Sequence, residues 1–390
     1  MDTLKKAETI SGDIIALRRR LHQVPEIGLR LPQTARIITM ELDRLGIPWR
    51  KINDSYDGIV AEISRGKGKT VVFRADIDGL PIVEQTGLDF AAANGAMHAC
   101  GHDCHAAILL GAARMFSEDE SFSGTVRMIF QPAEETVGAA RRMCEDGAMN
   151  NADAFFAVHV GNMVKEESGR LIITEGAVMA SRDSFTITVT GKGCHGATPA
   201  EGKDPIVVSA YIITALQTMV SREIDGTDSA VLTIASIHSG DAYNVIPDAA
   251  VMTGSIRTLN SRIRQQFVRR LEELACGIAA LMGAKAQIEW DEGMPVTDCD
   301  KGMTAYVRQT AERMFGKQAV TSLCKPLMSS EDAGYYLQRA KGCYFFFSTN
   351  PKGCEVFPNH NPHFMVDDSL LYKMSALFFE LGIGVLDEGK

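Results

Sequence analysis

Two adjacent glutamates, Glu134 and Glu135, end the segment 131–135 that directly follows the apolar run 126–130, and they are the first residues that indicate chemistry. Neighbouring carboxylates point in different directions, so one can hold a metal ion while the other moves a proton. Upstream, Cys100 and His102 form a Cys-x-His pair. Because thiolate and imidazole are good ligands for zinc and other borderline ions, the pattern favours a metal-dependent hydrolase.

Two further histidines could join this group. His159 ends the apolar strand predicted over 155–158, and His360 lies in the polar loop 358–364. Glu135 also follows a predicted strand. In α/β sheets, ligands gather beyond the carboxyl ends of the strands, so we expect these segments to converge.

Taken singly, each motif has an ordinary structural explanation. A lone Cys-x-His is mostly noise, and a glutamate pair is usually a solvated helix start. His98 and His105 are alternative ligands, although packing or supporting roles are favoured for them. Only the occurrence of several ligand types at several strand ends favours a metal site.

The elements that must position these side chains alternate along the first half of the chain. Residues two apart on a helix face apart, so Cys100 and His102 are expected on a loop before the next helix. Apolar patterns predict helices over 12–24 (capped by Ser11), 33–45, 104–116 (capped by Asp103) and 137–144, and strands over 58–63, 70–74, 124–130 and 154–159. Such alternation is typical of an α/β layer with a largely parallel sheet flanked by helices.

The pattern then changes to the order β-α-β-β-α-β. The expected elements are 184–189, 205–221, 230–238, 249–257, 261–282 and 284–290. This order predicts a ferredoxin-like insert. Helices at 302–314 and 369–386, with a strand at 342–347 between them, return to the first pattern. We therefore expect a discontinuous catalytic domain, 1–181 and 290–390, with an inserted lid or dimerisation domain, 182–289.

Composition excludes several classes of protein. The 390 residues carry a formal charge of −9, which argues against nucleic-acid or anionic-membrane partners. We expect no membrane helix, because no stretch approaches the roughly 20 apolar residues that one needs. We expect no signal peptide, because no apolar core follows the charges at the N-terminus. Nine cysteines without a CxxC repeat fit reduced thiols in the cytoplasm and argue against a thiol redox protein.

Over nearly its whole length the sequence resembles the di-metal aminoacylase and glutamate-carboxypeptidase family, in particular its N-acyl-amino-acid amidohydrolases. That group includes hippurate hydrolase, the indole-acetyl-amino-acid hydrolases and N-acetyl-diaminopimelate deacetylase. The motifs that carry the resemblance follow one another at 19–26, 73–81, 97–105, 131–135, 191–199, 244–247, 330–332 and 360–364.

The resemblance implies two divalent metal ions per subunit. Each ion would be held by its own pair of ligands, and one further residue would bridge the two ions. Cys100 would bridge the ions; the ligand pairs would be Glu135 with His360 and His102 with His159. Glu134 would be the general base, and Asp78 would support the ligands from behind. Asp76 stands where many relatives carry a ligand histidine.

The resemblance also implies roles for three residues of the insert. His195, on a glycine-rich turn, would stabilise developing oxyanion charge, and it would act with Asn244 across a homodimer. Arg257 would bind the substrate carboxylate, although a surface arginine on a strand is the simpler interpretation without the family.

The predicted function is hydrolysis of the amide bond of N-acyl-amino acids, giving a carboxylate and a free amino acid. The alternative enzyme is a metallocarboxypeptidase or dipeptidase acting on dipeptides or aryl-glutamate conjugates. A binding protein that kept the fold without chemistry is disfavoured by intact Glu134. The expected metal is manganese, zinc, nickel or cobalt, and the expected assembly is a cytoplasmic homodimer or a tetramer. Departures from the family pattern at Cys194, Ala200 and Ala333 leave the acyl group open.

Overall fold

A computed structural model describes residues 2–136 and 138–387 of the chain. The chain forms two compact units. Unit 1 comprises Met1–Val178, Asp298–Lys325 and Asp332–Lys390, and unit 2 comprises Met179–Thr297 and Pro326–Glu331. The short segment 326–331 therefore belongs with unit 2, although it lies beyond the insert expected over 182–289.

Unit 1 is built on a mixed sheet that has eight strands in the described part of the chain. Their order across the sheet is β1 (Trp49–Lys51), β2 (Ile59–Arg65), β4 (Gly124–Gln131), β3 (Thr70–Asp76), β5 (Ala154–Gly161), β16 (Lys341–Ser348), β6 (Leu171–Ile172) and β15 (Val320–Thr321). The central strands β4, β3, β5 and β16 run parallel to one another. Their carboxyl ends therefore share one edge of the sheet.

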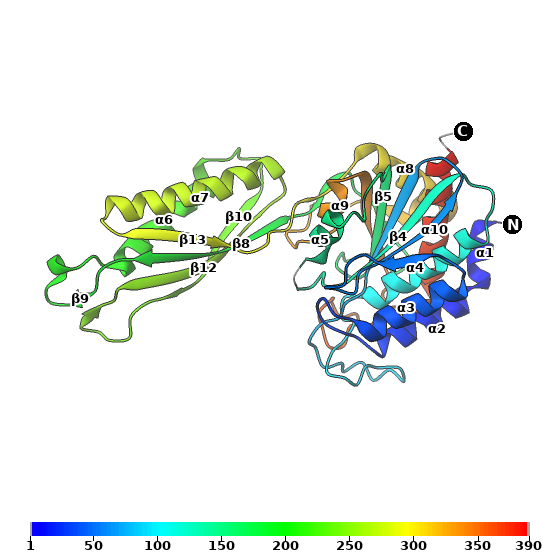
Figure 1. Ribbon diagram of the computed structural model, residues 1–390, viewed down its shortest axis with the longest axis horizontal. Helices are drawn as coiled ribbons and strands as arrows, with labels where there is room; N and C mark the ends of the chain where they lie inside the picture. The colour runs from blue at the N-terminus through cyan, green and yellow to red at the C-terminus, as the bar shows by residue number, and fades with distance from the viewer. Residues whose placement is uncertain (1, 137, 388–390) are drawn as a thin grey trace. The chain divides into compact units, whose positions relative to one another are not determined.

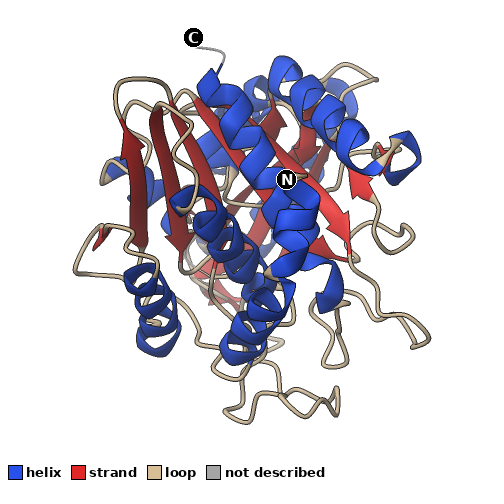
Figure 2. Cartoon of the chain, turned by 90° about the vertical axis from the view of Figure 1, so that its right-hand side faces the viewer, coloured by secondary structure: helices blue, strands red, loops and turns tan. Residues whose placement is uncertain are grey.

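Helices cover both faces of this sheet (Figures 1 and 2). One layer contains α1 (Thr3–Thr9), α2 (Ser11–His22), α3 (Pro32–Arg44), α4 (His102–Ser117), α8 (Lys301–Phe315) and α10 (Leu371–Asp387). On the other face lie α5 (Ala139–Glu145) and α9 (Gly334–Leu337), which pack against each other. Phe73 of β3 packs against the first layer, with its ring 5.8 Å from that of Phe116 of α4 and 4.9 Å from that of Phe378 of α10.

Unit 2 has the predicted βαββαβ order: β8 (Ser181–Thr190), α6 (Pro205–Arg222), β10 (Ala230–His238), β12 (Ala249–Thr258), α7 (Ser261–Leu281) and β13 (Lys285–Trp290). The strands pair antiparallel in the order β10-β12-β8-β13. Strand β8 alternates buried and half-exposed residues, so one face of the sheet packs against α6 and α7. The core includes Phe185, Ile212 and Phe267.

Short elements complete the chain. The strands β9 (Cys194–His195) and β11 (Val245–Ile246) form a small ribbon, and β7 (Gly176–Met179) pairs with β14 (Thr297–Cys299). Single turns of 3-10 helix occur at Pro199–Glu201, Lys317–Ala319 and Asp368–Leu370.

The predicted fold class is confirmed, but both predicted helix caps are wrong. Ser11 is the first residue of α2, and Ile10 precedes it without a side-chain cap. The residue before α4 is Gly101 in a left-handed conformation, so His102 is helical and is not on the loop as expected. Asp103 instead turns inward to Arg18 and His22. Of the helix predicted over 137–144, Val137 lies outside the described residues.

One expectation about composition also needs correction. By length and composition alone, the segment Asp368–Asp387 is apolar enough to cross a membrane. Within the protein, 61% of its apolar window is buried. The helix α10 within it packs against α4, α1 and the sheet, which accounts for its apolar composition.

Candidate metal centre

The parallel edge of the sheet brings together residues from four separate segments. Cys100 lies on the loop that leads into α4, and His102 is the first residue of that helix. His159 lies near the end of β5, Glu135 follows β4, and His360 lies in the loop after β16. These positions meet at one edge because the strands β3, β4, β5 and β16 are parallel.

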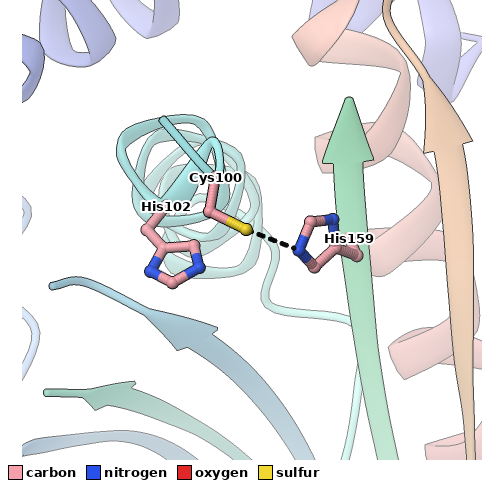
Figure 3. A group of neighbouring side chains, drawn as sticks. All are labelled: Cys100, His102 and His159. Carbon is pink, nitrogen blue, oxygen red and sulfur yellow. Dashed lines mark hydrogen bonds between the residues drawn. The ribbon is translucent and has the colours of Figure 1, made fainter. Parts of the chain in front are cut away.

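Cys100, His102 and His159 form one cluster of possible ligand atoms (Figure 3). Their ligand atoms all lie within 4.8 Å of one another, and Cys100 Sγ is 3.4 Å from His159 Nε2. All three side chains are buried. A charged thiolate in such a place needs a positive partner, because burial disfavours an isolated charge.

A second cluster joins Cys100 to Glu135 and His360. Glu135 Oε1 lies 3.0 Å from His360 Nε2. Cys100 and Glu135 beside the imidazole raise the pKa of His360 to about 10. The two clusters share Cys100, which is the arrangement that a residue bridging two ions requires.

Backbone carbonyl groups determine which ring nitrogen of His102 and of His159 can face a metal ion. His159 Nδ1 donates to the carbonyl oxygen of Val160 at 2.8 Å, and His102 Nδ1 donates to the carbonyl oxygen of Asp78 at 3.0 Å. A carbonyl only accepts, so both Nδ1 atoms carry a proton and both Nε2 atoms face the cluster. Such second partners fix the orientation of metal-binding histidines.

Asp78 supports two possible ligands at once. One carboxylate oxygen lies 3.2 Å from His102 Nδ1, and the other accepts the backbone N–H of Glu135 at 3.0 Å. Burial raises the pKa of Asp78. Asp78 thus contacts both His102 and the backbone of Glu135.

The residues fit a pair of divalent cations. Within the described part of the chain, His102 Nε2 and Glu135 Oε1 are buried without a hydrogen-bond partner, although Glu135 Oε1 lies close to His360. Burial alone would lower the pKa of His102, but Asp76 and Asp78 raise it well above its ordinary value, so the environment favours a positive charge at that nitrogen. A thiolate, imidazoles and a carboxylate are together a suitable donor set for borderline metals.

Asp76 and His105 lie beside the candidate ligands His102 and His159. Asp76 Oδ2 lies 3.4 Å from His102 Nε2 and 3.0 Å from Arg74. His105 Nδ1 pairs with Asp76, while its Nε2 accepts the Val160 N–H at 2.9 Å. Both nitrogens of His105 are therefore occupied, which favours the supporting role.

His98 belongs to neither cluster. Both of its ring nitrogens are buried and have no hydrogen-bond partner among residues 2–136 and 138–387, and burial lowers its pKa to about 4. It is a neutral packing residue, in keeping with the favoured interpretation.

Glu134 stands beside these clusters. Its carboxylate lies within 4.8 Å of the ligand atoms of His102 and Glu135, and the residue is 8% exposed. The preceding Ala133 has φ of 55°, and His360 has φ of 67°. Left-handed conformations are costly for residues other than glycine and cluster at functional sites. The backbone is thus strained where it turns Glu134 and His360 toward the site.

The remaining predicted residues lie in unit 2. His195 is exposed on β9 and faces Val245 of β11 in register, with exposed Asn244 just before that strand. Arg257 of β12 donates to the carbonyl oxygen of Met328 at 2.9 Å and faces Arg182 across the ladder. Burial and Arg182 lower the pKa of Arg257. Among the described residues no carboxylate forms an ion pair with Arg257.

One residue of the site was missed by sequence reasoning. Asn359, directly before His360, donates from its side chain toward Cys100. Only its place in a polar loop beside a possible ligand could have drawn attention to it.

The chain is similar to known proteins over most of its length. A model of peptidase family M20/M25/M40 matches residues 72–381. An N-acetyl-L-cysteine deacetylase of Bacillus subtilis is 37% identical over 98% of this chain and 90% of its own. Thermostable carboxypeptidase 1 of Saccharolobus solfataricus is 36% identical over 97% of each chain. A solved dinuclear metal-binding peptidase of Bacillus subtilis superposes with a TM-score of 0.82 at 34% identity, covering 97% of this chain and 99% of that one.

Proposed function

Since the chain belongs to peptidase family M20/M25/M40, we propose that this hydrolase cleaves the amide bond of N-acyl-amino acids. The products are a carboxylate and a free amino acid. The family resemblance seen in the sequence is confirmed by the match. The relative named as an N-acetyl-L-cysteine deacetylase supports the proposed substrate class.

The observation that carries the proposal is a shared thiol with the carboxylate of Glu134 beside the ligand clusters. Cys100 belongs to both ligand clusters, and the carboxylate of Glu134 lies within 4.8 Å of ligand atoms of His102 and Glu135. Cys100, His102, His159, Glu135 and His360 would hold the ions. When bound, the ions supply a water of lowered pKa and polarise the substrate carbonyl.

The protein's own residues then move protons and fix the substrate. Glu134 takes a proton from the attacking water as the new carbon–oxygen bond forms, and it gives that proton to the nitrogen as the carbon–nitrogen bond breaks. His195 donates to the developing oxyanion. Arg257, with Arg182 opposite, binds the substrate carboxylate, because two guanidinium groups facing each other favour an anion between them.

The metal is proposed to be zinc, manganese, nickel or cobalt, two ions per subunit. The thiolate and imidazoles favour the softer ions, while the carboxylate permits manganese.

The assembly is proposed to be a homodimer, or a tetramer built from it, through unit 2. Strand β10 is an edge strand of its sheet and exposes Val231 and Ile237, while α6 exposes Tyr211 at 61%. An open edge with apolar side chains favours pairing with a second copy. The molar mass of the protein in solution tests this proposal, and a monomer would contradict it.

A cytoplasmic location is also proposed. It is supported by nine cysteines that are all free, since thiols of this number stay reduced most readily in that compartment.

The decisive experiment is reconstitution of metal-free protein with manganese, zinc, nickel or cobalt, each in turn. Each form is assayed on N-acetyl-amino acids, N-benzoyl-amino acids and dipeptides. We expect metal-dependent release of free amino acid from acylated substrates, and none from Glu134→Gln protein with the same metal content. Fully loaded protein that leaves all acylated substrates intact would contradict the proposal.

The second candidate is a carboxypeptidase or dipeptidase, favoured by the relative named Thermostable carboxypeptidase 1. The same assay separates the two functions, because this candidate requires a higher kcat/KM on dipeptides than on N-acetyl-amino acids.

A further inference from the structure

Asn359 touches the shared thiol without being one of the proposed ligands. Its Nδ2 lies 3.8 Å from Cys100 Sγ and 3.4 Å from the Cys100 carbonyl oxygen. Its Oδ1 accepts the backbone N–H of Asn162 at 3.1 Å. One amide therefore links the loop of Cys100 to the segment that follows β5.

The orientation of this amide is set by its partners. The N–H of Asn162 is a donor, so it must meet the oxygen of Asn359 and not the nitrogen. The NH₂ group then faces Cys100, where a carbonyl oxygen and a sulfur can each accept one of its two protons. Chemical complementarity leaves no alternative in which the amide is flipped.

Packing holds the amide in this place. Gly161, the last residue of β5, has φ of 111°, and a Cβ added there would lie 2.8 Å from Asn359 Nδ2. The glycine therefore leaves the space that the amide fills. The neighbouring Asn162 side chain also bonds to the Phe357 carbonyl oxygen, and His360 N–H donates to the Ala99 carbonyl oxygen at 2.8 Å. The loop is thus attached on both sides of Asn359.

We propose that Asn359 is a positioning residue that donates a hydrogen bond to the Cys100 thiolate, fixing the sulfur between the two ligand clusters and reducing its electron donation. The inference rests on the proposed metal site. A hydrogen bond to an ionised sulfur is charge-assisted, and it stabilises the lone pair that the sulfur would otherwise give to a metal. The same bond ties the His360 loop to Cys100, so two proposed ligands keep their separation.

The test uses cobalt(II) alone as the probe, since cobalt–thiolate bonds absorb in the near ultraviolet. Metal-free wild-type, Asn359→Leu and Asn359→Ser proteins are titrated with cobalt, and the charge-transfer band and dissociation constant are measured. We expect the band to move to longer wavelength in both variants, because the sulfur then donates more strongly. We expect cobalt affinity to fall by about tenfold, because the sulfur loses its fixed position between the ligand clusters. The serine variant guards against a folding defect of the leucine variant, and circular dichroism checks both.

Two controls separate the possible failures. Asn361→Leu changes the same loop at a residue whose side chain accepts the His363 N–H, and it should leave the band in place. Cys100→Ser should abolish the band; if it does not, the proposed metal site is wrong. If the band depends on Cys100 but folded Asn359 variants match the wild type in band and affinity, the inference about Asn359 alone is overturned.

Discussion

At the scale of single residues, the proposed chemistry depends on neighbouring side chains with separate tasks. Glu134 and Glu135 are adjacent, yet Glu135 lies 3.0 Å from His360, and its backbone N–H is held by Asp78. The strained Ala133 before them sets the direction of the turn. Separation of the metal ligand from the proton carrier is therefore built into the backbone.

The first prediction concerns this division. Glu134→Gln should keep its metal and lose about 10²–10⁴-fold in kcat, because only the proton carrier is removed. Glu135→Gln should instead lose metal affinity, because a ligand is removed. Metal content by elemental analysis and kcat in excess metal distinguish the two variants. Equal metal loss in both would contradict the assignment.

The second prediction concerns Asp78, which accepts from His102 and from the Glu135 N–H. In Asp78→Asn the amide must turn an N–H toward one of these donors, so metal affinity should fall by about 10–100-fold. Competition with a coloured chelator measures the change. Asp153→Asn is the matched control, since Asp153 accepts the Thr70 N–H at the start of β3, and it should leave affinity unchanged.

The ligand types could be predicted from the residues and the supporting place of Asp78 from the family resemblance, but the contact made by Asn359 could not. A cysteine and a histidine before a predicted helix, and a glutamate and a histidine after predicted strands, are visible in the chain itself. Asn359 becomes meaningful only when its amide meets Cys100, which lies 259 positions away. The capping role expected for Asp103 failed for the same reason, because Arg18 and His22 draw its carboxylate inward. Contacts between distant segments override local preference at these positions.

At the scale of elements, unit 1 depends on close packing of α2, α4 and α10. Gly111 of α4 lies where they meet, and a Cβ there would be 2.5 Å from Ser375 Oγ and 2.7 Å from Ile14 Cδ1. Arg18 and His22 of α2 contact Asp103 at the start of α4, next to His102. The approximate ranges of these three helices could be predicted from apolar periodicity, whereas this contact depends on three-dimensional packing.

The third prediction follows from that contact. Gly111→Ala should destabilise unit 1 by about 1–3 kcal/mol, because the methyl group has no space unless the Ser375 and Ile14 side chains shift. Urea denaturation of the metal-free protein measures the effect. Gly12→Ala is the matched control, since an added Cβ at this helical residue meets nothing within 4 Å. An unchanged midpoint for Gly111→Ala would contradict the packing argument.

The fourth prediction concerns the ion pairs between α2 and α4. Burial opposes charge on His22, but Asp103 at 2.7 Å outweighs it and raises the pKa of His22 above 6.5. Because the folded pKa is raised, this stabilisation is fully present below pH 6.5 and is lost as the pH rises through the folded value. The free energy of unfolding should therefore fall as the pH rises from 6.5 through the folded pKa of His22, and His22→Gln should flatten this decline. Equal slopes for both proteins would contradict this assignment.

At the scale of the whole molecule, the proposed machinery is divided between two units. Unit 1 supplies the proposed ligands and Glu134, while unit 2 supplies His195, Asn244 and Arg257. The order of the main elements of unit 2 could be predicted from hydrophobic periodicity, whereas in unit 1 the short elements α1, α9, β1, β6 and β15 were not predicted. The proposed homodimer also determines which copy of the chain contributes His195. Each site would take His195 from the partner subunit.

The fifth prediction tests that answer by mixing two inactive proteins. If each site takes Glu134 from one subunit and His195 from its partner, a mixed dimer of Glu134→Gln and His195→Ala chains has one complete site. With random pairing half of the dimers are mixed, so about a quarter of wild-type activity should return. Co-expression of differently tagged chains provides the mixed dimers, and His195→Ala alone should keep its full metal content. Purified mixed dimers without activity would show that His195 does not act on the partner's site.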